Sequence, residues 1–169
     1  MKIYTKTTFQ KLPISIDQAW DFLSDPKNLQ TITPKYMGFK IIGGSEKKMF
    51  SGQIIQYIVK PILGISTKWV TEITHVKEGS YFVDEQRFGP YSLWHHKHFI
   101  REIEGGVEME DIIDYKLPFG FLGQLIHPII VKPKLDEIFN YRFNKLIEIF
   151  GEYGKTDSYT RNELLKNII

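Results

Sequence analysis

The residues best suited to chemistry are His96 and His98, which lie two positions apart in a segment with the alternating pattern of a β-strand. Their side chains therefore point to the same face of that strand. With a neighbouring carboxylate such as Asp111 they are candidate catalytic residues, an imidazole acting as general base and the carboxylate orienting it, for a cyclisation, dehydration or hydrolysis. With Asp111 or Glu85 they also supply the ligand types of a two-histidine, one-carboxylate metal site. A His-x-His pair is a weak motif by itself, so the sequence predicts neither a metal nor a cofactor.

Glycine turns predict which residues oppose these histidines. A two-residue hairpin at Gly105–Gly106 places His98 opposite Ile113 and makes Asp111 a diagonal neighbour of His98. A second turn at residues 89–90 adds alternate residues of the preceding strand to the same face. The opposite face is mostly charged, so the histidine face is expected to point inward. The predicted inward wall comprises Tyr81, Val83, Glu85, Trp94, His96, His98, Ile100, Asp111, Ile113 and Tyr115.

This wall has two interpretations, and the sequence leaves both open. In the first, its polar groups orient the hydroxyl, carbonyl or carboxylate of a ligand inside an apolar cavity. In the second, His98 bonds Asp111 and His96 bonds Tyr115 in a network that only fixes the sheet register, since an unpaired buried polar group costs about 1–3 kcal/mol. Burial lowers the pKa of a histidine and a nearby carboxylate raises it, so the direction of the pKa shifts also stays open.

The elements that position these residues follow from local signals along the chain. Residues 3–12 alternate like a strand. Ser15 and Gln18 form a capping-box pattern at the start of a helix, and Asp25 with Pro26 begins a short second helix. Further β segments are separated by short turns, which favour antiparallel pairing and bring the total to seven strands. These segments are residues 39–42, 51–59, 67–76, 81–88, 92–103 and 107–117.

A long amphipathic helix is expected from about residue 122 to residue 153, with Pro128 and Pro133 kinking or dividing its first part. Its apolar stripe is expected to face the sheet. Arg142 either points at the carboxylates of the sheet or forms an ion pair on the helix surface. Three residues of this helix complete the predicted binding site: Phe139, Arg142 and Phe143.

The order of elements and four motifs carry a resemblance to a known superfamily. The motifs are residues 89–98 (GPYSLWHHKH), Gly105–Gly106, residues 111–120 (DIIDYKLPFG) and residues 139–142 (FNYR). On these the chain resembles the START-like superfamily (SRPBCC), in a bacterial branch of the polyketide-cyclase and ligand-binding type. The resemblance implies an α+β helix-grip fold, in which a curved, seven-stranded antiparallel sheet wraps around the long C-terminal helix, with two short helices after the first strand. It covers residues 1–153 as one ligand-binding domain and leaves residues 154–169 as a tail or short extra helix.

Composition sets limits on the class of protein. A chain of 169 residues with 42% hydrophobic content fits one domain with its own core. Its 22 basic and 20 acidic residues are scattered, so no nucleic-acid partner is expected. The absence of cysteine excludes disulfides and thiolate catalysis. Its apolar runs are far shorter than the roughly 20 residues of a membrane-spanning helix, and no signal-peptide pattern opens the sequence, so a cytoplasmic protein is expected.

The leading functional prediction is the binding of a small hydrophobic or amphipathic molecule between sheet and helix, by a monomer or weak homodimer that serves as a carrier, sensor or accessory module. The resembled superfamily includes enzymes, but none of their catalytic signatures is present, so a cyclase-, dehydratase- or hydrolase-like enzyme using the His/Asp cluster is the alternative. A second alternative is a protein-interaction module, linked to cell division by labels within the resembled branch. Its contact surfaces would be the apolar tip at residues 61–65 and the tail at residues 155–169.

Overall fold

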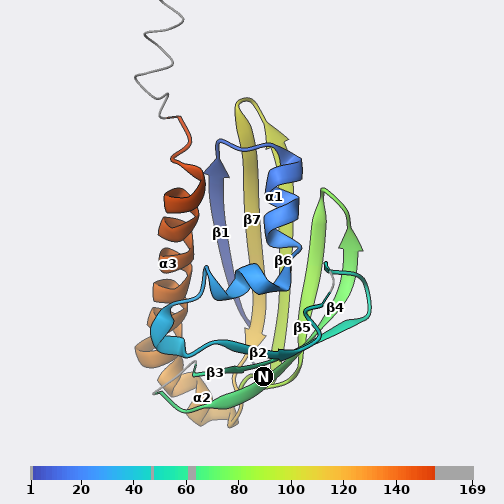
Figure 1. The fold of residues 1–169 in the computed structure, drawn as a ribbon. Helices are drawn as coiled ribbons and strands as arrows, with labels where there is room; N and C mark the ends of the chain where they lie inside the picture. The colour runs from blue at the N-terminus through green and yellow to red at the C-terminus, as the bar shows by residue number, and fades with distance from the viewer. Residues whose placement is uncertain (1, 47, 61–63, 155–169) are drawn as a thin grey trace, which may run out of the picture.

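The computed structural model describes residues 2–46, 48–60 and 64–154. Within these residues the chain forms a sheet of seven antiparallel strands in the order β1-β7-β6-β5-β4-β3-β2 (Figure 1). The elements are β1 (Tyr4–Leu12), α1 (Ile16–Leu23), η1 (Pro26–Gln30), η2 (Lys35–Met37), β2 (Lys40–Gly43), β3 (Gln53–Val59), β4 (Thr67–Lys77), β5 (Tyr81–Phe88), β6 (Leu93–Ile103), β7 (Gly106–Lys116), α2 (Gly120–Ile126), η3 (His127–Val131) and α3 (Lys132–Phe150). This is the predicted α+β helix-grip architecture, which is thereby confirmed.

Two local caps start the short helices where the sequence predicts them. The Ser15 hydroxyl accepts a hydrogen bond from the Gln18 amide at 3.2 Å, and the Gln18 side chain accepts one from the Ser15 amide at 3.0 Å. The Asp25 carboxylate accepts from the Lys27 amide at 3.0 Å and begins η1, a 3-10 helix with Pro26 in its first turn. The capping box and the Asp-Pro start are therefore present as predicted.

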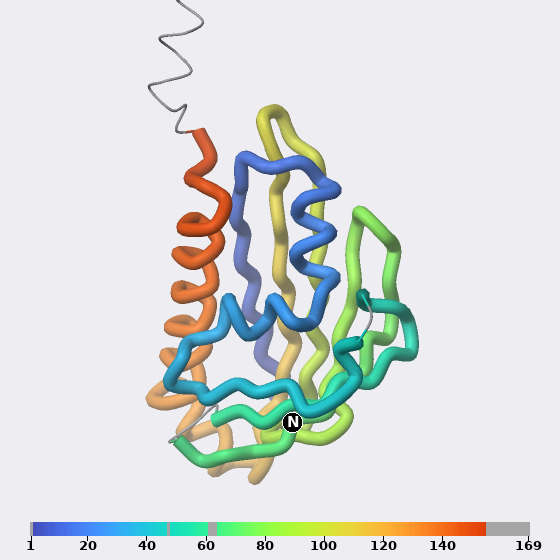
Figure 2. Tube along the Cα trace, in the orientation of Figure 1, coloured from blue at the N-terminus to red at the C-terminus, as the bar shows by residue number. Residues whose placement is uncertain are grey.

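The sheet bends strongly, so that β2 and β3 come round in front of the lower ends of β6 and β7 (Figures 1 and 2). The pairing of β4 with β5 shifts twice, between Val70 and Thr71 and between Ile73 and His75. Such irregularities bend a strand and increase its twist, which explains the curvature at this point. The concave face that results is covered by α1, which contacts β6 and β7, and by α3, which contacts β1.

The C-terminal helical segment begins earlier than predicted, at Gly120, and runs through α2, η3 and α3 to Phe150. Pro128 lies in η3, a single π-helical turn, and Pro133 lies in the first turn of α3, where its missing N–H is tolerated. The two prolines thus mark a change of helix type where a kink or division was expected. Of the predicted tail, residues 155–169 lie outside the described residues, and so do residues 61–63 of the apolar tip.

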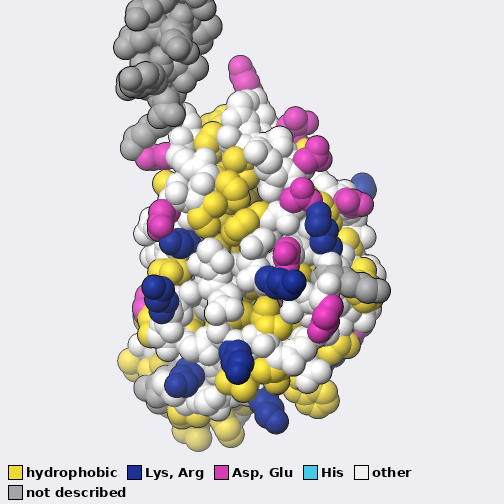
Figure 3. All heavy atoms as spheres, in the orientation of Figure 1, with side chains coloured by type: hydrophobic (Ala, Val, Ile, Leu, Met, Phe, Trp, Pro, Cys, Tyr) yellow, Lys and Arg dark blue, Asp and Glu magenta, His cyan; other side chains and the backbone are white. Residues whose placement is uncertain are grey.

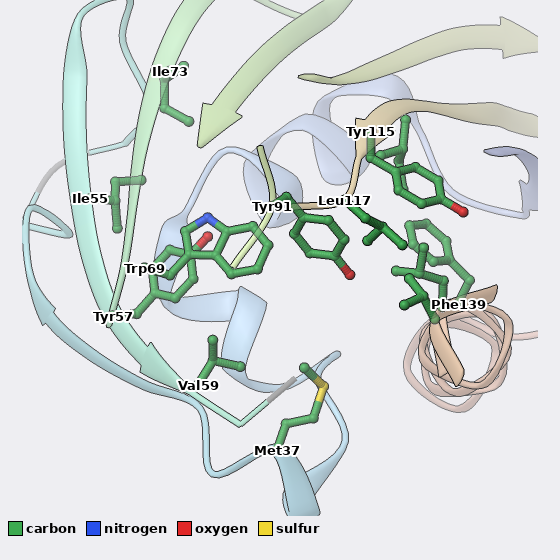
Figure 4. Close-up of a cluster of buried hydrophobic side chains, with 13 residues drawn as sticks. Met37, Ile55, Tyr57, Val59, Trp69, Ile73, Tyr91, Tyr115, Leu117 and Phe139 are labelled. Atoms are coloured by element: carbon green, nitrogen blue, oxygen red, sulfur yellow. The ribbon is translucent and has the colours of Figure 1, made fainter. Parts of the chain in front are cut away.

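Two clusters of buried apolar side chains form the core. One cluster fills the space between α1, α3 and the end of the sheet that carries the β6–β7 turn, and it includes Leu12, Trp20 and Leu146. The other is rich in aromatic rings and lies between β3, β4 and α3. Figure 4 shows Trp69 and Tyr91 of this second cluster lying between the sheet and α3, and Phe139 projecting from α3. The aromatic cluster is the one that borders the candidate site.

Large apolar side chains are exposed around α2. Phe119 is 80% exposed, Phe121 72% and Ile129 75%. Figure 3 shows apolar side chains gathered at the same lower end of the molecule. Phe119 also adopts a left-handed conformation with φ 63° at the start of α2. Among the described residues, no helix is both long enough and apolar enough to cross a membrane.

Candidate functional site

The pairing of β6 with β7 differs from the predicted register by two residues. The hairpin turn consists of Glu104 and Gly105, with Gly105 at φ 75°, so that Ile103 pairs with Gly106. Gly106 is the first residue of β7, and the close approach of β1 explains why it is glycine, since a Cβ atom there would lie 2.1 Å from the carbonyl oxygen of Leu12. A shift of two residues keeps every side chain on its predicted face but changes the opposed pairs. The predicted pairs were therefore wrong, whereas the inward direction of the β6 face was right.

His98 is now directly opposite Asp111, and His96 is opposite Ile113. The predicted hydrogen bond from His96 to Tyr115 is absent, because Tyr115 pairs with Trp94 instead. The phenol of Tyr115 lies 2.7 Å from Nε2 of His127 on η3. Burial raises the pKa of Tyr115 to about 12, so its hydroxyl stays protonated at neutral pH.

The predicted pairing of β5 with β6 was wrong by one residue. This difference exchanges the two faces of β5. Asp84 pairs with His96, and Phe82 pairs with His98. The cause is the connection between the strands, which is four residues long, 89–92, and is closed by Gln86 bonding both the amide and the carbonyl of Tyr91. Since a one-residue slip moves every side chain to the other face, Asp84 replaces Glu85 beside the histidines.

The three predicted β5 residues accordingly lie away from the histidine cluster. Tyr81 contacts the ring of Phe99 at a centroid distance of 5.8 Å. Glu85 lies 2.9 Å from the Nδ1 atom of His95. Val83 is buried but pairs with Lys97 on the outward face of β6. Their placement in the inward wall was wrong.

A buried polar network occupies the centre of the inward face. Nε2 of His98 lies 2.9 Å and Nδ1 of His96 lies 3.5 Å from Oδ2 of Asp84. Nε2 of His96 lies 3.1 Å and Nδ1 of His98 lies 2.6 Å from Oδ1 of Asp111, although this His98 nitrogen makes no hydrogen bond within the part of the chain that the structure describes. Nη1 of Arg142 on α3 lies 3.4 Å from the same Asp111 oxygen. Arg142 thus points at a carboxylate of the sheet, one of its two predicted arrangements.

The side chains of this network shift one another's pKa values and so decide which of them are charged. Burial alone would raise the pKa of Asp111, but the Arg142 guanidinium and the two imidazoles hold it well below its usual range. Burial would also raise the pKa of Asp84, yet the histidines lower it. For His98, the two carboxylates outweigh burial and raise the pKa, whereas burial and the neighbouring His98 lower the pKa of His96. Both carboxylates are therefore ionised at neutral pH, and His98 is the imidazole that accepts a proton more readily.

Beside this network lies a cavity of about 180 Å³, enclosed by the concave face of the sheet, the end of α1, the η1–η2 segment and α3. Five members of the predicted site line it: Trp94, His96, His98, Phe139 and Arg142. Asp111 lies behind the histidines and is not part of this lining. Ile100 and Ile113 are buried core residues, and Phe143 is 42% exposed and lies outside the cavity.

Several residues of the cavity were missed by the sequence analysis. Asp84 was missed because of the register error, although its spacing from the buried Phe82 would have placed it correctly. Trp69 and Tyr91 also line the cavity, and their aromatic character was the available signal. The buried Nε1 of Trp69 has no hydrogen-bond partner among the residues that the structure describes, and neither does Nε of Arg142.

Asp84, His96 and His98 also form a group that could hold a metal ion. One ligand atom from each lies within 4.8 Å of the others. Sequence analysis named Asp111 or Glu85 as the carboxylate of such a group. The structure puts Asp84 in that position.

Comparison with known proteins supports the fold. No protein-family model and no curated protein matches the sequence. Among solved structures, the ZhuI aromatase/cyclase from Streptomyces sp. R1128 matches with a TM-score of 0.65 at 11% identity, covering 87% of this chain and 93% of that one. Protein CV1439 from Chromobacterium violaceum matches with a TM-score of 0.66 at 12% identity, covering 87% and 97%. Protein Ms6760 from Mycobacterium smegmatis matches with a TM-score of 0.62 at 14% identity, covering 88% and 96%. The chain therefore has the START-like helix-grip fold.

Proposed function

We propose that this protein binds a small hydrophobic or amphipathic molecule in the cavity between the sheet and α3. The observation that carries the proposal is the composition of the cavity wall. Aromatic and aliphatic side chains form most of it, while Asp84, His96, His98 and Arg142 gather on one side. Binding sites for small molecules commonly combine an apolar wall with a few convergent polar groups.

The polar side of the cavity indicates what the ligand offers. Asp84, His96, His98 and Arg142 all line the cavity. A hydroxyl, carbonyl or carboxylate of a ligand would supply hydrogen-bond partners to these groups, and each polar group left unpaired would cost about 1–3 kcal/mol. A flat ring system bearing a hydroxyl, carbonyl or carboxylate suits such a cavity, because it can pack against the aromatic residues and still present an oxygen to the polar side.

The fold supports this function without identifying the ligand. ZhuI is an aromatase/cyclase, and at 11% identity the likeness extends to the fold alone. For this chain, turnover by His96, His98 and Asp111 stays a prediction, as do the cytoplasmic location and the monomeric or weakly dimeric state. The effect of substituting these three residues on turnover can be measured only when a ligand is known. Binding is therefore the property to test first.

The test uses 2-naphthol, which combines an aromatic ring system with one hydroxyl. We expect saturable one-to-one binding by isothermal titration calorimetry and a higher melting temperature in its presence. Val59→Phe places a larger side chain in the cavity wall, because Val59 is 3% exposed and lines the cavity. Ile58→Phe, on the other face of β3, is the matched control.

Binding should fall at least tenfold in Val59→Phe and stay within twofold of wild type in Ile58→Phe. Native mass spectrometry of the purified protein, with and without 2-naphthol, gives the stoichiometry and reveals any molecule that copurifies. Equal affinity in wild type and Val59→Phe, with both proteins folded, would show that the cavity is not the binding site.

A further inference from the structure

Each of the two imidazoles of the polar network lies between the same two carboxylates. Each presents one ring nitrogen to Asp84 and the other to Asp111: Nδ1 of His96 and Nε2 of His98 face Asp84, while Nε2 of His96 and Nδ1 of His98 face Asp111. Asp84, His96 and His98 line the cavity, whereas Asp111 lies behind them. One nitrogen of each ring therefore converges with Asp84 at the cavity wall.

The spacing of the converging atoms matches a metal site. Oδ2 of Asp84 lies 3.5 Å from Nδ1 of His96 and 2.9 Å from Nε2 of His98, and one ligand atom from each of the three residues lies within 4.8 Å of the others. Zinc bonds of about 2.0–2.2 Å to nitrogen and oxygen place tetrahedral ligand atoms roughly 3.4 Å apart. We infer that Asp84, His96 and His98 bind a divalent transition-metal ion, such as Zn²⁺, at the wall of the cavity.

Asp111 supplies a second, independent part of this arrangement. Its Oδ1 lies 3.1 Å from Nε2 of His96 and 2.6 Å from Nδ1 of His98, the two nitrogens that do not face Asp84. Histidine ligands usually give their other ring nitrogen to a carboxylate, which fixes the ring orientation. Arg142, with Nη1 3.4 Å from the same oxygen, holds Asp111 in place from α3. Asp111 is thus a positioning residue for His96, which it hydrogen-bonds, and its charge lies beside the His98 ring without a hydrogen bond to it among the described residues.

The net charge of the site and the types of its ligand atoms favour a divalent transition-metal ion. With both imidazoles neutral, Asp84, Asp111 and Arg142 leave one net negative charge, which a divalent cation reverses. Two nitrogen ligands and one oxygen suit zinc, iron, cobalt and nickel better than magnesium or calcium, which prefer oxygen ligands. Three protein ligands leave at least one coordination position, and since all three residues line the cavity, a molecule bound there would be close to the ion. The metal site stands independently of the proposed organic ligand, although an oxygen of such a ligand would reach the open position.

The same contacts would also occur in a network of ion pairs that binds no metal. The following experiment distinguishes the two arrangements. Protein freed of metal by dialysis against EDTA is titrated with Zn²⁺ by calorimetry and with Co²⁺ by visible absorption. The metal site predicts one ion per chain. Asp84→Asn, His96→Gln and His98→Gln should each lower the affinity at least tenfold, and Asp111→Asn by about 10–100-fold.

His95→Gln is the matched control, since His95 neighbours His96 in sequence but lies on the outward face of β6, beside Glu85. Its affinity for Zn²⁺ should equal that of wild type. Loss of the ion in His95→Gln, or its retention in the His96→Gln and His98→Gln variants, would overturn the assignment.

A measurement on the wild-type chain covers the case in which the variants do not fold. Nitrogen-15 NMR of the histidine side chains during Zn²⁺ titration identifies the bound atoms. We expect Nδ1 of His96 and Nε2 of His98 to shift as metal ligands. Failure of Zn²⁺ and Co²⁺ to bind in stoichiometric amounts, or binding through other nitrogens, would refute the site. Binding of 2-naphthol to the metal-free protein is measured separately, so that either property can fail alone.

Discussion

Replacing Arg142 by methionine is predicted to destabilise the metal-free protein by about 3 kcal/mol. Methionine keeps an unbranched, flexible chain in the buried position but removes the cation beside Asp111. Removing one partner of a buried ion pair costs about 3–5 kcal/mol. The single contact of 3.4 Å between Nη1 and Oδ1, and the additional support of Asp111 by His98, place this pair at the lower end of that range. In a chain of this length, the loss corresponds to a decrease in melting temperature of about 6–12 °C.

The assay is urea unfolding at pH 7, followed by circular dichroism, on wild type, Arg142→Met, Asp111→Asn and the double variant. Because the two side chains interact, the double variant should be more stable than the sum of the single losses predicts, by at least about 1 kcal/mol. Lys132→Met is the control, since its contact with Asp136 is exposed to solvent and should contribute about 0.5 kcal/mol or less. An Arg142→Met variant within 1 kcal/mol of wild type, or additive losses, would refute the reasoning.

Two further predictions concern the parts of the fold that frame the site. Burial and the nearby Lys2 and Lys132 lower the pKa of His127, so the folded state favours the neutral ring. The contribution of this ring to stability should be lost as the pH falls below about 6.5, the value in the unfolded chain. His127→Gln removes this contribution, and equal pH dependence of the unfolding free energy in both proteins between pH 7 and 5 would contradict it. Gly106→Ala places a Cβ atom 2.1 Å from the carbonyl oxygen of Leu12, and should cost about 1–3 kcal/mol in urea unfolding. Unchanged stability would mean that β1 and β7 approach less closely there.

The face of a strand follows from its own sequence, which is why part of the site could be predicted. Trp94, His96 and His98 alternate with charged or outward residues, and all three line the cavity. The pattern of the long helix likewise placed Phe139 towards the sheet, whereas it left two arrangements open for Arg142, which the structure places at the cavity. Periodicity of this kind depends on local geometry alone, so an error elsewhere in the chain does not affect it.

Pairing between strands depends on turn geometry, and there the prediction failed. The connection 89–92 is held by two hydrogen bonds between the Gln86 side chain and the backbone of Tyr91, one donated and one accepted by the side chain, which no turn rule anticipates. That one-residue difference put Asp84 beside the histidines in place of Glu85. The closure of the cavity depends on contacts between distant segments, such as the hydrogen bond from the Lys60 amide to the Met37 carbonyl at 2.8 Å, and periodicity carries no information about these.

The most direct test of ligand binding in the cavity is the indole N–H signal of Trp69 in a ¹H–¹⁵N NMR titration of wild type with 2-naphthol. Trp69→Phe assigns the signal. Because the Trp69 side chain lines the cavity, an aromatic ligand bound there should shift this signal progressively, with saturation at one ligand per chain. Binding that leaves the Trp69 indole signal unchanged, for example on the exposed apolar surface around Phe121, would contradict the proposed function.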